Sequence, residues 1–206
     1  AGHTGTLDPL ATGVLPLCFG AATKFSGLQL DAPKTYEAIA LLGVTTTTGD
    51  AEGEVLQRCA VDEAALTPQR LAQVAQQFTG PIRQVPPMHS ALKKDGKALY
   101  EYARAGVEVE RPARDVFISA LNLALTHTEQ AQAAIKIRVT CSKGTYIRTL
   151  GEDIGQALGC GAHLVFLRRV ETGGLGLEGC VTLAQLEACD DAQRLAWVQP
   201  VQTLLA

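Results

Sequence analysis

Two strand patterns joined by a short polar connection limit the fold of this chain more than any other feature. Residues 116–125 (VFISALNLAL) and 133–141 (AAIKIRVTC) are rich in apolar and β-branched side chains, and THTEQAQ joins them. Parallel strands need a crossover of a dozen or more residues, and this connection is too short to provide one. We therefore expect residues 116–141 to form an antiparallel hairpin.

The other predicted elements alternate between strands and helices without a regular βαβ repeat, which favours an α+β fold over a doubly wound sheet. We expect a mixed, largely antiparallel sheet flanked by helices. Thr67 precedes Pro68 and an amphipathic repeat, which is typical of a capped helix start. The expected strands are 34–44, 54–60 and 162–172, and the expected helices are a short buried one within 10–25, one from Thr67, one over 145–159 capped by Thr145, and one starting near Thr182.

Charge is distributed unevenly along the chain. The formal net charge is −3, yet basic residues outnumber acidic ones between Arg83 and Arg114. Prolines, an Asp-Gly turn and a short helical pattern make residues 84–114 look like an excursion from the core. This segment is either a solvated surface or a contact for an anionic partner. The six cysteines are scattered without a CxxC pair, which is typical of reduced thiols in a cytoplasmic protein.

A single carboxylate stands out near the start of the sequence, in GHTGTLDPLATGVLP (Gly2–Pro16). Pro9 fixes its own φ and biases Asp8 away from the α region, so the acid is held in a restricted turn. An Asp before Pro is also a good helix N-cap. From the residues alone, Asp8 is either a cap or a reactive group.

Three further motifs match chemical patterns only in part. GLGLEG (Gly174–Gly179) lacks the following strand and acid of a dinucleotide site. SALK (Ser90–Lys93) fits the SxxK pattern of serine acyl enzymes but lacks its companion elements. CGAH (Cys160–His163) with Cys141 supplies at most three zinc ligands. A serine hydrolase that uses Ser90 stays open as an alternative.

Several segments together resemble one family. The stretch GHTGTLDPLATGVLP resembles the catalytic motif of the TruB-type tRNA pseudouridine synthases. Three later segments resemble, in the family's order, its tyrosine strand and loop, its RNA-gripping insertion, and its arginine helix with the leucine strand: KTYEAIALLGVTTTTGDAEGEV, VPPMHSALKKDGKALYEYARAGVEVERPAR and CSKGTYIRTLGEDIGQALGCGAHLVFLRRVETG. The resemblance covers almost the whole chain. It implies a pseudouridine synthase fold, with residues 1–206 as a catalytic domain that includes the RNA-binding insertion 84–114.

The resemblance also implies a reaction and a set of site residues. The reaction is the conversion of uridine to pseudouridine at position 55 in the T loop of tRNA, which requires neither a cofactor nor a metal. Asp8 would attack the nucleotide or stabilise charge on the sugar, and Arg148 would keep Asp8 ionised and aimed. Tyr36 would stack on the flipped base. The substrate-binding residues would be Leu167, which walls the pocket, His3, which fills the gap left by the base, and Lys93, Lys94 and Lys97, which contact the RNA backbone.

Other functions compatible with these motifs are a guide-dependent pseudouridylase subunit and a catalytically silent tRNA-binding or chaperone module. The family's N-terminal Lys-Pro strand would precede Ala1 and its C-terminal PUA domain would follow Ala206. We therefore expect a monomeric catalytic domain, trimmed at both ends, that has the T stem-loop of tRNA as its partner and no membrane association.

Overall fold

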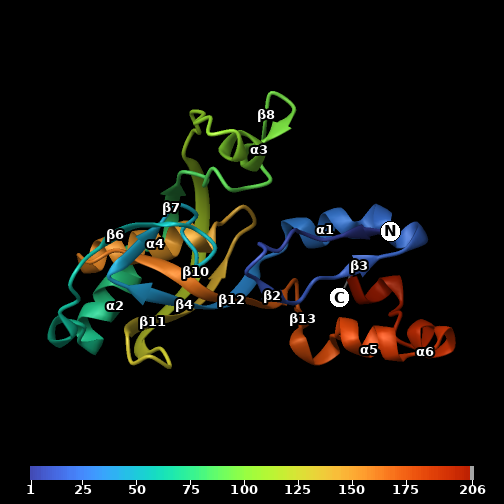
Figure 1. The fold of residues 1–206 in the computed structure, drawn as a ribbon. Coiled ribbons are helices and arrows are strands. Elements are labelled where there is room, and N and C mark those ends of the chain that lie inside the picture. The colour runs from blue at the N-terminus through green and yellow to red at the C-terminus, as the bar shows by residue number, and fades with distance from the viewer. Residues whose placement is uncertain (205–206) are drawn as a thin grey trace.

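A seven-stranded sheet runs through the centre of the structure, a computed structural model that describes residues 1–204 (Figure 1). All neighbours on its main path are antiparallel, whereas β2 (Thr12–Gly13) pairs in parallel with β12. The predicted α+β fold with a mixed, largely antiparallel sheet is therefore confirmed. The path runs through β13 (Leu175–Gly176), β12 (Ala162–Thr172), β4 (Lys34–Leu42), β11 (Ala133–Cys141), β10 (Arg114–His127) and β7 (Gly80–Gln84).

Helices α2 (Pro68–Gln77) and α4 (Ile147–Leu158) pack against one face of this sheet. The alternation along β11 explains why only one face is covered. Ile135 and Ile137 are fully buried beneath the helices, while Lys136 is exposed on the other face. Apolar side chains on alternate positions therefore build one continuous core between sheet and helices. Its helical members include Leu71, Val74, Leu150 and Ile154.

Most of the local sequence predictions are confirmed. Strands β10 and β11 form the expected hairpin. The Thr67 hydroxyl accepts a hydrogen bond from the Arg70 N–H at the start of α2, and Thr182 caps α5 (Leu183–Ala188) in the same way. The predicted strand 54–60 is observed as β6 (Val55–Arg58), paired with β5 (Val44–Thr46).

The predicted buried helix within residues 10–25 is wrong. The chain instead forms β2, then β3 (Leu17–Cys18) paired with β1 (Gly2–His3), a 3-10 helix η1 (Gly20–Phe25) and a short helix α1 (Ser26–Asp31). Gly13 explains the difference, because it has φ +109° and a Cβ there would collide with the Arg169 backbone. The backbone groups of this segment form hydrogen bonds with β12 instead of the hydrogen bonds of a helix.

Thr145 is not the N-cap of α4, which is a second correction. The cap residue is Tyr146, and the Thr145 hydroxyl donates to the Ser142 carbonyl 2.9 Å away. The Gln84 side-chain amide accepts from the Tyr146 N–H and donates to the Tyr146 carbonyl. A residue on β7 therefore fixes the start of α4.

Residues between β7 and β10 leave the sheet as a projecting segment (Figure 1). It contains β8 (Lys93–Lys94), β9 (Lys97–Ala98) and α3 (Leu99–Arg104). Asp95 and Gly96 both have positive φ, as a type I′ turn requires, so the Asp-Gly turn joins β8 and β9 as a two-residue hairpin.

Near the end of the described chain, α5 is followed by α6 (Asp191–Ala196) and by the 3-10 helix η4 (Val201–Leu204). Among residues 1–204, no helix has the length and apolar character needed to cross a membrane.

The packing of α4 on β12 gives the first testable prediction. A Cβ on Gly155 would lie 2.5 Å from the Ala162 Cβ, so Gly155→Ala forces α4 away from β12. We expect this change to lower the free energy of unfolding by about 1–3 kcal/mol, the usual cost of overpacking. Gly27→Ala in α1 is the matched control, because nothing lies within 4 Å of its Cβ position. Urea denaturation should show Gly27→Ala unchanged or slightly more stable. Equal effects of both changes would contradict this account of the interface.

Candidate active site

Residues 4–16 form a loop that is anchored at both ends, hereafter the Asp8 loop. The Thr4 N–H donates to the Pro16 carbonyl 3.2 Å away, and the Val14 N–H donates to the Arg169 carbonyl 2.8 Å away. The Asp8 carbonyl accepts from the Ala11 N–H at 2.8 Å, so Asp8 lies in a tight turn. No helix starts after Asp8, and its side chain is free to take part in other contacts.

The Asp8 carboxylate forms a two-contact ion pair with Arg148, from the first turn of α4. Arg148 Nε donates to Oδ2 at 2.8 Å and Nη2 donates to Oδ1 at 3.1 Å. The Arg148 side chain is 3% exposed and that of Asp8 is 32% exposed. Two parallel hydrogen bonds fix the plane of the carboxylate as well as its position. One side of Asp8 therefore stays open while the guanidinium holds the other.

Arg148 also joins two further segments to this pair. It donates to the Thr48 carbonyl at 3.1 Å and to the His89 carbonyl at 2.7 Å, at the base of the projecting segment. A second carboxylate also lies close to Arg148, with Asp50 Oδ2 3.7 Å from Arg148 Nε. The helix, the Asp8 loop, the loop after β5 and the projecting segment thus converge on one buried guanidinium.

Asp50 is a candidate site residue that the sequence analysis missed. It is buried, and its carboxylate accepts from the Thr48 hydroxyl and the Glu52 N–H. The only sequence signal was one acid after a Thr-Gly step in TTTTGDAEGEV, which also fits an ordinary turn. Its placement beside Arg148 depends on a bridge between Asp50 and Leu164 of β12, which local sequence does not reveal.

Leu167 lies on the same sheet face as Tyr36 because of a β-bulge. The register between β12 and β4 shifts between Leu164 and Phe166, after which Leu167 pairs with Ala38 and Arg169 pairs with Tyr36. A bulge adds one residue to a strand and reverses which side chains point to each face. Leu167 is consequently 3% exposed, and Tyr36 is partly buried against the core. Burial raises the pKa of Tyr36, while the Arg169 guanidinium beside it acts in the opposite direction.

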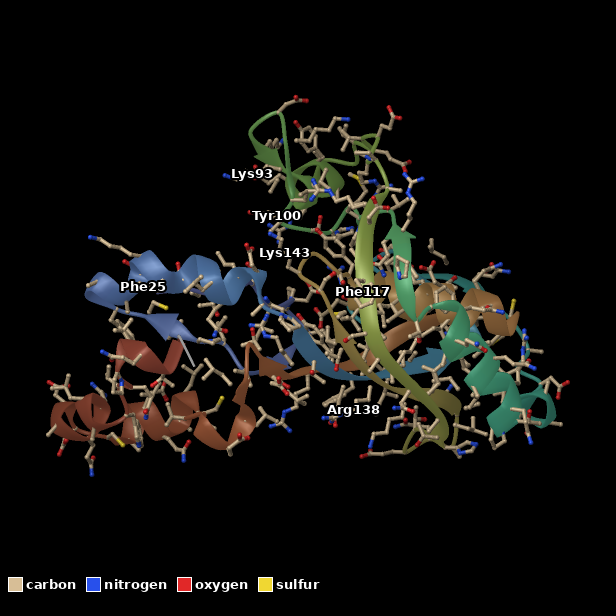
Figure 2. The ribbon with its side chains drawn as sticks, turned by 180° about the vertical axis from the view of Figure 1, so that it is seen from behind. Phe25, Lys93, Tyr100, Phe117, Arg138 and Lys143 are labelled. Carbon is tan, nitrogen blue, oxygen red and sulfur yellow. The ribbon has the colours of Figure 1, made fainter. Side chains whose placement is uncertain are left out.

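The remaining predicted site residues lie apart from this cluster. His3 is exposed on β1, and its Nδ1 accepts from the Gly5 N–H at 3.3 Å. Lys93 and Lys97 are exposed on the β8–β9 hairpin, and Lys97 lies over the Tyr102 ring. Lys94 differs, because its ammonium donates to the Glu110 carbonyl and supports the projecting segment itself. Figure 2 shows Lys93 and Tyr100 on this segment, with Lys143 between it and α1.

Ser90 is not arranged as an acyl-enzyme nucleophile. Its Oγ is buried and has no hydrogen-bond partner among residues 1–204, so no base is placed to activate it. The structure therefore gives no support to the serine hydrolase alternative.

Comparisons with known proteins define the class. A sequence model described as "TruB family pseudouridylate synthase (N terminal domain)" matches residues 1–147, and one described as "tRNA pseudouridylate synthase B C-terminal domain" matches residues 148–206. Fold and sequence are thus those of a pseudouridylate synthase. The chain belongs to the TruB family.

Similar proteins agree with this assignment. The chain is 73% identical to tRNA pseudouridine synthase B of Verminephrobacter eiseniae and 62% identical to that of Ralstonia nicotianae, and each alignment covers 100% of the chain. It spans 62% and 64% of the length of those relatives. A chain in a crystal structure of a Cbf5-Nop10-Gar1 complex is 29% identical, with a TM-score of 0.67 over 98% of this chain and 52% of that one.

Glu152 gives the site a pH-sensitive contact. It lies one turn after Arg148, and its carboxylate packs closely against Gly49. Burial raises the pKa of Glu152 from 4.5 to about 6, Asp153 and Asp50 add to the rise, and Arg148 opposes it. Ionised Glu152 is thus disfavoured in the folded state relative to the unfolded chain.

We expect Glu152→Gln to stabilise the protein at high pH only. Because the folded pKa of Glu152 exceeds the unfolded value, its ionisation penalty is fully present above about pH 6 and disappears below about pH 4.5. Melting temperatures measured across this range should show a gain for Glu152→Gln at high pH that vanishes in acid. The exposed Glu129→Gln is the control and should show no such trend. A gain independent of pH would contradict the assigned cause.

Proposed function

We propose that the protein carrying this chain converts uridine to pseudouridine at position 55 in the T loop of tRNA. The observation that carries the proposal is the Asp8–Arg148 pair, a half-open carboxylate held by a buried guanidinium. The relatives named tRNA pseudouridine synthase B support tRNA as the substrate.

The reaction is an isomerisation whose atoms balance without a second substrate. The bond between uracil N1 and the ribose C1′ breaks, the base turns, and C5 bonds to C1′. The C5 proton is lost to water and N1 gains one. Charge develops on the sugar as the first bond breaks, and the ionised Asp8 is placed to stabilise it or to attack. Arg148 keeps that carboxylate ionised and fixed in direction.

The base must leave its stack before Asp8 can reach the sugar. We propose that Tyr36 stacks on the flipped uracil and that Leu167 packs beneath it, since the bulge in β12 brings both to one sheet face. We also propose that His3, which is exposed on β1, occupies the space that the flipped base leaves in the RNA. The projecting segment would contact the RNA backbone through Lys93 and Lys97, and the T stem-loop would be recognised by its shape.

The guide-dependent alternative has weaker support. The Cbf5 structures share the fold at 25–29% identity, whereas relatives named tRNA pseudouridine synthase B reach 73%. A silent tRNA-binding module would not need a carboxylate that is buried on one side and open on the other. A direct assay of activity separates all three functions.

The first functional prediction concerns Asp8→Asn in the full-length protein. We expect loss of tritium release from C5-labelled T-arm RNA, because the other carboxylate within 4 Å of Arg148 in residues 1–204, that of Asp50, is buried. RNA affinity should stay within about tenfold, roughly 1.4 kcal/mol.

Asp115→Asn is the matched control, since the Asp115 side chain is 90% exposed and pairs with Arg83 at the surface. It should release tritium at the parent rate. A rate for Asp8→Asn above a tenth of the parent rate would falsify the role given to Asp8.

The second functional prediction concerns RNA contact by the projecting segment. Lys93 and Lys97 are exposed, so changing both to Ala should leave folding intact and remove up to two phosphate contacts. Each contact contributes about 0.7 to 0.9 to the slope of log affinity against log salt, so the loss of two contacts should flatten the slope by up to roughly 1.8. Lys94 is left unchanged because it supports the segment.

Fluorescence-anisotropy titrations of a T-arm hairpin at several salt concentrations measure this slope. The exposed Lys136→Ala on β11 is the control and should keep the parent slope. If the double variant also keeps it, the RNA backbone lies elsewhere.

A further inference from the structure

Arg169 is the largest fully buried side chain among residues 1–204, at 1% exposure. It makes no ion pair within those residues, so its charge is matched only by neutral acceptors. Burying an arginine without a carboxylate is costly unless its donors are satisfied with good geometry. The groups that Arg169 contacts therefore indicate the role of this buried side chain.

Two of its donors hold the Asp8 loop from both sides. Arg169 Nε donates to the Val14 carbonyl at 2.7 Å, and Nη2 donates to the Gly5 carbonyl at 3.1 Å. Gly5 and Val14 lie on either side of Asp8 in sequence. The Arg169 carbonyl also accepts from the Val14 N–H at 2.8 Å. Arg169 of β12 therefore holds the backbone of the Asp8 loop at two positions, one before Asp8 and one after it.

The same guanidinium contacts Tyr36. Arg169 and Tyr36 are directly opposed in the pairing of β12 with β4, where opposed side chains on one face lie in contact. The positive charge of Arg169 lowers the pKa of the Tyr36 phenol, against the larger effect of burial. Arg169 therefore holds the Asp8 loop and faces Tyr36 at the same time.

We propose that Arg169 is a positioning residue that fixes the Asp8 loop relative to the Tyr36 phenol. This inference rests on the proposed pseudouridylation, in which both residues meet the same nucleotide. Arg148 orients the Asp8 carboxylate itself, whereas Arg169 fixes the backbone of the loop to which Asp8 belongs. A single lysine ammonium has the charge but not the planar fork that reaches both carbonyls.

The first test compares Arg169→Lys and Arg169→Met with the matched Arg168→Lys and Arg168→Met in the full-length protein. Arg168 is the preceding residue of β12 and is exposed on the opposite face. We expect Arg169→Lys to lower kcat for T-arm RNA at least tenfold with KM within about threefold, and Arg169→Met to lower it further. The Arg168 variants should retain the parent kcat.

The second test does not depend on activity. The chain has four tyrosines, so the ¹³Cζ resonance of Tyr36 can be assigned with Tyr36→Phe. The titratable groups facing Tyr36 are Arg169 from β12, Cys141 from β11 and Asp8 from its loop. Only Arg169 lowers the pKa of Tyr36, so its replacement by Met should raise that pKa and reduce the ionised fraction at a fixed alkaline pH. The Arg168 variants should titrate like the parent.

The two tests distinguish a failure of the proposed function from a failure of the positioning role of Arg169. If the parent protein releases no tritium, the proposed function fails, and the Tyr36 titration still tests the contact with Arg169. A folded Arg169→Lys variant with parent kcat overturns the positioning role. A loss of kcat in Arg169→Met without any change in the Tyr36 titration also overturns it, because the residue would then act on stability alone.

Discussion

The ion pair between Asp8 and Arg148 is the interaction on which the rest of the site depends. Arg148 is almost fully removed from water, so each of its hydrogen bonds is stronger than at the surface, and losing one partner would leave a costly buried charge. Its acceptors come from separate parts of the chain: the Asp8 carboxylate and the carbonyls of Thr48 and His89. Satisfying one guanidinium therefore brings three loops to the start of α4, and the helix, packed on β12 through Gly155, provides a rigid base for them.

A second buried arginine, on β12, completes the arrangement from the sheet side. Arg169 donates to the backbone of the Asp8 loop and is paired with Tyr36 across β12 and β4, so helix and strand each contribute one guanidinium to the same loop. The β-bulge in β12 makes this possible, because it turns Leu167 and Arg169 toward the face that carries Tyr36. Bulges are common beside active sites for this reason. In the proposed isomerisation, the protein contributes orientation and a fixed charge, while the reacting atoms are all in the nucleotide.

The sequence predicted those features that depend on local pattern. The β10–β11 hairpin and the Thr67 cap were correct because alternation and capping act within a few residues. The helix expected near residues 10–25 failed, since pairing with β12 overrode local propensity. Asp50 and Arg169 were missed because a buried partner far along the chain gives each its role. The residues around Asp8 were compatible with a helix cap, and only the resemblance to a family indicated chemistry.

The most direct measurement of the central claim is single-turnover tritium release by Arg148→Lys, made well below its melting temperature. Arg138→Lys is the control, because Arg138 forms a surface pair with Glu37 on the solvent face of the sheet (Figure 2). Lysine keeps the charge of Arg148 but not the two-contact geometry on Asp8. The account predicts at least about a hundredfold loss for Arg148→Lys, or roughly 2.7 kcal/mol, and no loss for Arg138→Lys. A folded Arg148→Lys variant that reacts within tenfold of the parent would contradict it.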